Sequence, residues 1–231
     1  MAISFESIPF LEAIKMMKRR GIFPSEIYYS KEFQRVLRNY AFSVAGMSNA
    51  AQLQNVLDSL TENLKTGETF ETWKEKIAAE KYAVAALPES RLDIIFRTNI
   101  MSQYNSGRLN NAIKFKKQFP LVLISAIMDS RVRKQHAVFN GIVTQINSPT
   151  FQAWMNRNMF RCRCTFVTLT ERTAKKWIDE DKARLKNNPE LAKERETFAN
   201  ELGKLPVDKL KASAEIYKGT PFELYVNKLL P

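Results

Sequence analysis

The strongest constraint on the fold is a change of hydrophobic pattern at Pro120. Before it, residues 89–119 place apolar side chains at helical spacing. After it, "LVLISAIM" (121–128) is an unbroken apolar run of strand length. "GIVTQI" (141–146) and "CRCTFVTLT" (162–170) are two further runs rich in β-branched residues. The pattern therefore predicts one long helix followed by a small sheet.

The segments on either side have helical patterns. Residues 50–64 repeat apolar side chains three and four positions apart, which is typical of an amphipathic helix. Thr69 and Ser25 stand where a side chain can cap the start of a helix. From residue 171 the chain returns to a mixed-charge helical composition that breaks near Pro189.

Together these patterns predict an α+β protein. We expect a helical N-terminal region (1–88), a compact domain in which one long helix packs on a small β-sheet (89–170), and a helical C-terminal arm (171–231). The N-terminus lacks the order of regions found in a signal peptide, and no apolar stretch is long enough to span a bilayer. We therefore expect a soluble protein that is cytoplasmic at synthesis and has no membrane anchor.

The positive charge is concentrated in the middle of the chain. The net charge is +12, and residues 91–170 contain 12 basic but only 2 acidic residues. Such an excess indicates a surface that faces phosphates or an acidic protein, although a merely solvated face is the alternative. Some arginines are also expected to pair with the two acids, Asp93 and Asp129. The candidate contacts to nucleic acid or protein are Arg131, Arg133, Lys134, Arg157, Arg161 and Arg163.

One histidine and two cysteines form the clearest candidate for chemistry. His136, Cys162 and Cys164 are the only residues of their types. A disulfide between positions i and i+2 would be strained, so the cysteines are expected to be free thiols or ligands. On a strand they would share one face, which suits a metal ion with His136 as third ligand and Asp129 as the fourth candidate. The alternatives are a buried cysteine that only packs, and a Cys–His nucleophile pair.

Other functional classes lack their motifs. The sequence contains no glycine-rich phosphate loop, no serine elbow and no HExxH helix, so an ordinary enzyme is disfavoured. Signatures of sequence-specific nucleic-acid readers are also missing. Contact with DNA is therefore expected to be independent of sequence.

The order of several motifs resembles the phage head morphogenesis, or minor head, family that is typified by the F protein of bacteriophage Mu. "RTNIMSQYNSGR" (97–108) precedes the first strand, "MDSRVRKQHAVFNGIV" (128–143) follows it, and "CRC" (162–164) comes last. The turn before the first cysteine differs from the one found in many members. The matching residues are Arg97, Thr98, Tyr104, Gly107, Arg108, Asp129, Arg131, Arg133, His136, Gly141, Pro149, Cys162, Arg163 and Cys164.

The resemblance implies a structural function in a tailed phage or prophage. A member of this family is expected to reach the virion head after synthesis in the host cytoplasm, and to associate with the portal, other head proteins and packaged double-stranded DNA. It implies no catalytic activity, and it favours a structural zinc at the His and Cys positions. Two rival interpretations are a metal-dependent hydrolase or nuclease with Asp129 as base, and a non-specific nucleic-acid-binding protein with no place in the virion.

Overall fold

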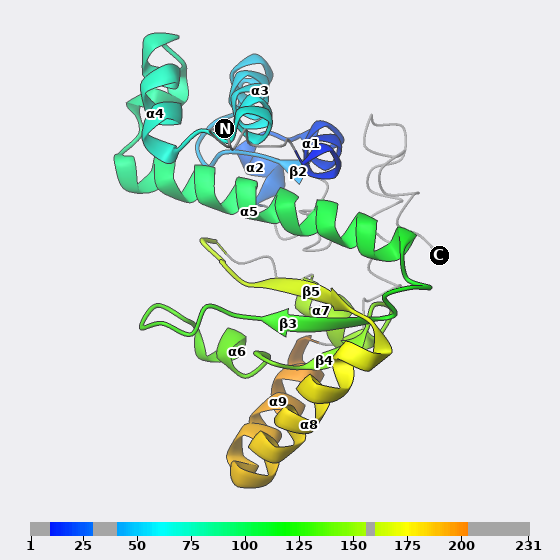
Figure 1. Ribbon diagram of the computed structural model, residues 1–231. Helices are drawn as coiled ribbons and strands as arrows, with labels where there is room; N and C mark the ends of the chain where they lie inside the picture. Colours follow the sequence, from blue (N-terminus) through cyan, green and yellow to red (C-terminus); the bar gives the residue numbers. More distant parts are fainter. Residues whose placement is uncertain (1–9, 30–40, 156–159, 203–231) are drawn as a thin grey trace, which may run out of the picture. The chain divides into compact units, whose positions relative to one another are not determined.

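The computed structural model describes residues 10–29, 41–155 and 160–202, and these fall into two compact units (Figure 1). The first unit contains the described residues up to Gly107 together with residues 160 and 161. The second contains residues 108–155 and 162–202. The boundary lies inside the long helix α5 (Glu89–Lys114). The structure therefore divides the chain differently from the sequence-based ranges 1–88, 89–170 and 171–231. The α+β class itself is confirmed.

The first unit is mainly helical, as the sequence predicts. It also contains two short parallel strands that no sequence pattern predicted, and these pair Gly21 with Ala41 and Ile22 with Phe42. None of the helices in the described residues combines the length and apolarity that a membrane crossing requires. Its elements are α1 (Leu11–Lys18), β1 (Gly21–Ile22), α2 (Ser25–Tyr28), β2 (Ala41–Phe42), α3 (Ala50–Thr66), α4 (Phe70–Ala79), η2 (Ala83–Ala86) and the first part of α5.

Helix capping follows the sequence at one of the two predicted positions. The Thr69 hydroxyl accepts a hydrogen bond from the Thr72 amide at the start of α4, as predicted. The prediction for Ser25 was wrong, because Pro24 is the N-cap of α2 and Ser25 is already in its first turn. The Ser25 hydroxyl instead accepts a hydrogen bond from the Gly46 amide at 2.8 Å, which ties α2 to a loop distant in sequence.

The core of the first unit is formed by the apolar faces of α1, α3 and α4 with part of α5. Leu53, Leu60, Trp73 and Val84 are almost completely buried. The indole nitrogen of Trp73 donates to the Ser59 hydroxyl at 3.1 Å, so this large side chain is buried without leaving a polar group unsatisfied. The predicted amphipathic helix and its capped neighbour therefore supply eight of the 17 buried residues of this cluster.

Gly107 permits close approach of α1 to α5. It is buried, and a Cβ built on it would lie 2.6 Å from the backbone nitrogen of Ala13. The obstructing atom belongs to the backbone, so it cannot move without shifting α1. The glycine costs about 1 kcal/mol of helix propensity relative to alanine, and this close packing compensates for it.

We expect Gly107→Ala to lower the free energy of unfolding by roughly 1–3 kcal/mol, because overpacking outweighs the gain in helix propensity. Urea unfolding of the full chain measures this change. Ser106→Ala, on the preceding residue, is the matched control and should be close to neutral. Stabilisation by Gly107→Ala would show that the two backbones are not in contact.

The second unit is a small sheet with helices. The sheet is antiparallel and its order is β4-β3-β5, so β3 is the central strand. Besides the last part of α5, the elements are β3 (Leu121–Ser125), α6 (Lys134–Ala137), β4 (Val143–Gln145), α7 (Pro149–Met155), β5 (Thr165–Leu169), α8 (Glu171–Asn187) and α9 (Pro189–Leu202).

Both faces of the sheet are covered, which explains why β3 is apolar at consecutive positions. Val122 and Ile124 point into a core that includes Trp154 of α7 and Phe166 of β5. Leu123, between them, points to the other face of the sheet. There it contributes to a separate cluster with Leu169 of β5 and Ala174 of α8. Helix α8 therefore packs on the sheet and is part of the second unit.

Two predicted elements were too long. The apolar run to Met128 does not continue as a strand after Ser125, because the Ala126 amide donates to the Asn140 side chain and the chain leaves the sheet. Ile127 and Met128 are consequently half exposed. The long helix ends at Lys114, five residues before the predicted end, and turns lead to Pro120. The last part of the predicted arm, from residue 203, lies outside the described residues.

Helices α8 and α9 are held to the loop after α6 by a buried charge network. Asp181 accepts hydrogen bonds from Arg184 and, through both carboxylate oxygens, from Arg195. The same two arginines donate to the Asn140 carbonyl, and Arg195 also donates to the Val138 carbonyl at 2.7 Å. The side chains of Asp181 and Arg195 are only 14% and 11% exposed, so neither charge is well solvated without the other.

The pKa of Asp181 lies below its ordinary value. Burial alone would raise the pKa of this carboxyl, but the hydrogen bonds and charges of Arg195 and Arg184 together outweigh burial and lower it. A carboxyl whose folded-state pKa is depressed stabilises the fold above its unfolded pKa of about 3.9. That contribution is lost as the pH falls through the lower folded-state value.

We expect Asp181→Asn to destabilise the second unit at pH 7 by on the order of 3 kcal/mol, because the largely buried Arg195 and the partly exposed Arg184 lose their counter-charge. Urea unfolding at pH 7 and at acidic pH measures the difference from wild type, which should shrink in acid. Glu180→Gln, which removes an exposed carboxylate 3.8 Å from Lys176, should change stability by less than about 0.5 kcal/mol. Equal effects of the two variants would contradict a structural function for the network.

Candidate metal centre and basic loop

His136 lies in the second unit on the short helix α6, after the loop that follows β3. The helix is a single turn, closed by a hydrogen bond from the Ala137 amide to the Arg133 carbonyl at 2.9 Å. Val138 and Phe139, directly after it, are buried in the core of the second unit and fix the position of the turn. The His136 side chain is consequently 3% exposed.

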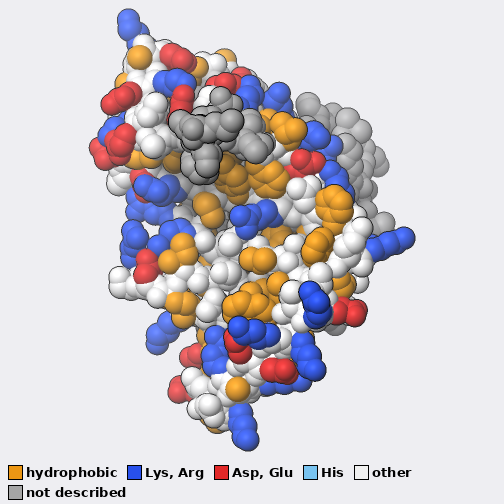
Figure 2. All heavy atoms as spheres, viewed as in Figure 1, with side chains coloured by type: hydrophobic (Ala, Val, Ile, Leu, Met, Phe, Trp, Pro, Cys, Tyr) orange, Lys and Arg blue, Asp and Glu red, His pale blue; other side chains and the backbone are white. Residues whose placement is uncertain are grey.

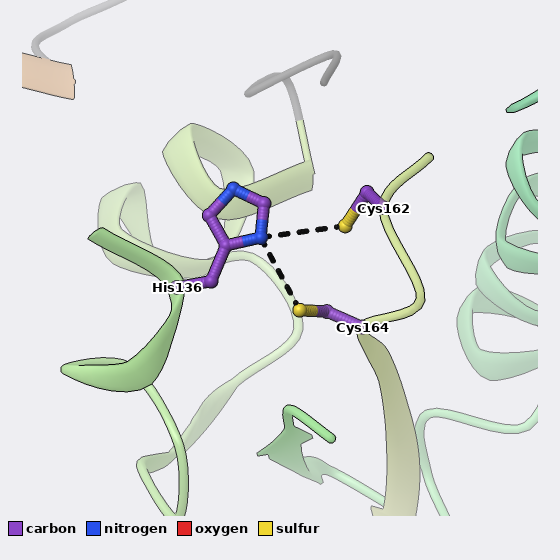
Figure 3. Close-up of side chains that lie close together, drawn as sticks. All are labelled: His136, Cys162 and Cys164. Carbon is purple, nitrogen blue, oxygen red and sulfur yellow. Dashed lines mark hydrogen bonds between the residues drawn. The ribbon is translucent and has the colours of Figure 1, made fainter. Parts of the chain in front are cut away.

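Cys162 and Cys164 precede β5 and are not on it, which corrects the prediction that both lie on a strand. Cys164 is buried and belongs to the same core as Phe166, whereas Cys162 is partly exposed. The two thiols still point in one direction, toward the His136 ring (Figure 3). The convergence therefore results from the course of the chain into β5 and not from strand alternation.

The geometry of the three side chains suits a metal ion. The Nδ1 atom of His136 lies 3.5 Å from the Cys162 sulfur and 3.3 Å from the Cys164 sulfur (Figure 3). All three ligand atoms lie within 4.8 Å of one another. Tetrahedral zinc, with bonds of about 2.3 Å to sulfur and 2.0–2.1 Å to nitrogen, places these atoms about 3.5 Å apart. The donor set and its spacing therefore fit zinc.

The two nitrogens of the His136 ring have different surroundings, and only Nδ1 faces the cysteine sulfurs. Nε2 is buried and has no hydrogen-bond partner among the described residues. Nδ1 faces the two sulfurs, so the ring presents its lone pair there when Nε2 carries the proton. A buried donor without a partner is costly, and a ligand bond at Nδ1 would offset that cost.

Asp129, the fourth candidate ligand, is not part of this cluster. Its two carboxylate oxygens each accept a hydrogen bond from Arg163, both at 2.7 Å, and one of them also accepts from the Arg131 amide at 3.1 Å. The hydrogen bonds from Arg163 hold the pKa of the Asp129 carboxyl well below its usual range. The described residues thus provide three ligands, and Asp129 instead orients the arginine that separates the two cysteines.

The predicted basic contacts differ in how far they are available to a partner. Arg163 is paired with Asp129, and Arg161 is paired with Asp93 at 2.8 Å. Both acids of the central segment therefore neutralise arginines, as the sequence analysis anticipated. Arg157 lies outside the described residues.

Three basic side chains are exposed between β3 and the start of α6: Arg131 and Arg133 on the loop, and Lys134 as the first residue of the helix. We call this segment, residues 131–134, the basic loop. The Arg131 side chain is 78% exposed, and its guanidinium lies 3.6 Å from an Asp129 oxygen. The basic loop is therefore an exposed group of three cations that an anionic surface can reach.

Five residues of the family motif, from Arg97 to Arg108, have structural contacts. In the first unit, Arg97 pairs with Asp93, and the Thr98 hydroxyl accepts from the Arg161 amide at 3.0 Å. Tyr104 stacks on Phe10, and Gly107 makes the close approach described above. In the second unit, Arg108 donates to the Thr165 hydroxyl and the Phe166 carbonyl, which joins the end of α5 to β5.

Gly141 and its neighbour Asn140 form a junction that sequence reasoning identified only in part. Gly141 has a φ of +83°, and a Cβ on it would lie 2.6 Å from the Arg184 guanidinium. The Asn140 side chain accepts from the Ala126 amide, and its carbonyl receives Arg184 and Arg195. The "NG" dipeptide is a sequence signal for a turn. The arginines that donate hydrogen bonds to the Asn140 carbonyl, however, lie 44 and 55 residues further along the chain.

Comparison with known proteins confirms the predicted family. Residues 54–167 match the family model described as phage Mu protein F like protein. The matched segment contains the basic loop, His136 and both cysteines. No match was found among curated proteins or among solved structures. Residues 54–167 are thus similar to the phage Mu F-like proteins, and this similarity supports a phage head morphogenesis protein.

We expect the purified protein to carry one zinc ion per chain, bound by the three ligands. Cys164→Ser and His136→Ala should abolish stoichiometric zinc, and chelation should lower the melting temperature of the wild type, because metal binding contributes to folding. Elemental analysis and thermal unfolding measure these effects.

Asp129→Asn is the control for the ligand set. The three-ligand arrangement predicts that this variant retains its zinc although it loses the ion pair with Arg163. Loss of zinc from Asp129→Asn to the same extent as from Cys164→Ser would mean that the carboxylate is a ligand after all.

Proposed function

We propose that this protein is a structural minor head protein of a tailed phage or prophage, acting near the portal in capsid assembly and in DNA packaging or delivery. The family match over residues 54–167 carries the proposal. In this function the protein works as an architectural component in the virion head, and its partners are the portal, other head proteins and double-stranded DNA.

The basic loop is proposed as the contact with DNA or with an acidic surface of the portal. Its three cations project from one short segment, while the nearest acid, Asp129, is already held by Arg163. Basic side chains on the drawn face occur at several places, interspersed with apolar ones, and do not form one continuous patch (Figure 2). A few phosphate contacts that are independent of base sequence suit this distribution.

The metal centre is proposed as the element that holds the basic loop in place. Zinc bound by His136 and the two cysteines would join the segment after β3 to the segment before β5. The loop lies within five residues of His136, so fixing the ring also restricts the cations that precede it. Restricting side chains and backbone before binding reduces the entropy lost on contact with a partner.

DNA binding measured across a salt series tests the proposed contact. The intact protein should bind duplex DNA of any sequence, with an affinity that falls as salt rises. Replacing Arg131, Arg133 and Lys134 with glutamine should reduce the slope of log K against log salt by roughly 0.9 for each phosphate that the variant no longer neutralises.

The matched control replaces Lys175, Lys182 and Lys186, three exposed lysines of α8, with glutamine. It removes the same charge and should leave the slope nearly unchanged. Equal reductions of the slope in both variants would show that only net charge matters. Absence of DNA binding at low salt would leave the portal as the partner of the basic loop, to be tested by co-assembly.

A metal-dependent hydrolase or nuclease is the second candidate, because three protein ligands leave one position of a tetrahedral ion for water. Asp129 is poorly suited as its base, since both carboxylate oxygens are engaged by Arg163. Turnover of DNA or peptide by the zinc-loaded wild type, lost in His136→Ala, would favour this candidate over the structural one.

A further inference from the structure

The first unit contains a cavity of about 280 Å³ beside the middle of α5, well away in sequence from the basic loop. This volume is close to the lower end of the range for pockets that hold small ligands. No acidic residue is among the described residues that line it. The charged and polar groups that line it are Arg20, Ser43, Arg91, Thr98, Asn99 and Ser102.

Arg20 supplies a buried positive charge to this cavity. Its side chain is only 8% exposed, and its guanidinium lies 5.9 Å from the centre of the Phe42 ring. One of its nitrogens donates to the Asn99 side chain, which fixes the plane of the guanidinium. Burial lowers the pKa of Arg20 to about 10, so the group is charged at neutral pH but poorly solvated. Arg20 therefore offers an occupant of the cavity a charged hydrogen-bond donor.

Two further groups extend this donor set. Arg91 donates to the Ala45 carbonyl at 2.5 Å, and this bond anchors a second guanidinium at the cavity wall. The Ser43 hydroxyl is buried and has no hydrogen-bond partner within the described residues. Rotation about χ1 can turn this hydroxyl toward an occupant. Two guanidiniums with adjacent hydroxyl and amide groups offer more donors than the two oxygens of a carboxylate use, which favours phosphate.

The rest of the wall is apolar and aromatic. Ile94 and Ile95 of α5 line one part, and Tyr28, Tyr29 and Phe160 contribute rings. The rings of Tyr28 and Tyr29 are packed edge to face with centroids 4.9 Å apart, so the two rings support each other but face different directions. Flat rings with a nearby arginine are the surface on which nucleic-acid bases stack.

We propose that this cavity binds a terminal phosphate on a nucleoside, with Arg20 and Arg91 holding the phosphate and the aromatic wall holding the base. The site goes beyond the structural function proposed above, since it lies in the other unit and uses none of the same residues. Free nucleotide and the 5′-phosphorylated end of a DNA strand share this chemistry.

Calorimetric titration of the full chain tests the proposal with separate probes. Deoxyadenosine monophosphate should bind more tightly than inorganic phosphate or deoxyadenosine alone, because only it engages both halves of the site. A short single-stranded oligonucleotide with a 5′-phosphate, compared with the same strand ending in a hydroxyl, distinguishes a strand end from a free nucleotide as the source.

Arg91→Gln is the diagnostic variant because Arg91 is partly exposed, whereas loss of the buried Arg20 would disturb the fold. It should raise the dissociation constant for the nucleotide about tenfold or more, as expected for a lost hydrogen bond to a charged group. Arg97→Gln removes an equal charge from the same helix outside the cavity and should leave binding unchanged.

Three results would overturn the proposal: no binding of any probe, equal binding of deoxyadenosine and its monophosphate, or equal weakening by Arg91→Gln and Arg97→Gln. Each is independent of the DNA slope measured for the basic loop, so this proposal and the proposed head function can fail separately.

Discussion

The pairing of β3 with β5 is the constraint on which the second unit depends. Their antiparallel register sets Ser125 opposite Thr165, so the chain leaving β3 and the chain entering β5 start from neighbouring points. His136 follows the first of these points and Cys164 immediately precedes the second. The three metal-ligand candidates therefore meet because of strand register, although 26 residues separate His136 from Cys162.

The pairing of β3 with β5 also brings charged residues of the central segment together. Arg163, between the cysteines, reaches back to Asp129 on the loop after β3 and forms a second link across this junction. The ion pair removes one cation from the surface, and the pairing of Arg161 with Asp93 removes another. The basic loop stays exposed, as do Lys116 and Lys117 after α5, so the positive charge is divided among small groups and a small number of phosphate contacts at each is the appropriate expectation.

The two units use buried arginines in different ways. In the second unit, Arg195 is matched by Asp181 and serves to dock α8 and α9 on the loop after α6. In the first unit, Arg20 lies at a cavity whose described lining contains no carboxylate. Arg195 with its carboxylate is a structural joint, whereas Arg20 lines a cavity that a ligand can enter.

Local sequence determined the elements, and only the tertiary structure decided their ends and contacts. Helical periodicity in 50–64, the cap at Thr69 and the apolar run that became β3 were all predictable, because each depends on residues a few positions apart. The family could be recognised from motif order. The end of β3 could not be predicted, because it depends on the Asn140 side chain taking the Ala126 amide. Likewise, the engagement of Asp129 by Arg163, and its exclusion from the metal cluster, follow from a contact across 34 residues that no local pattern records.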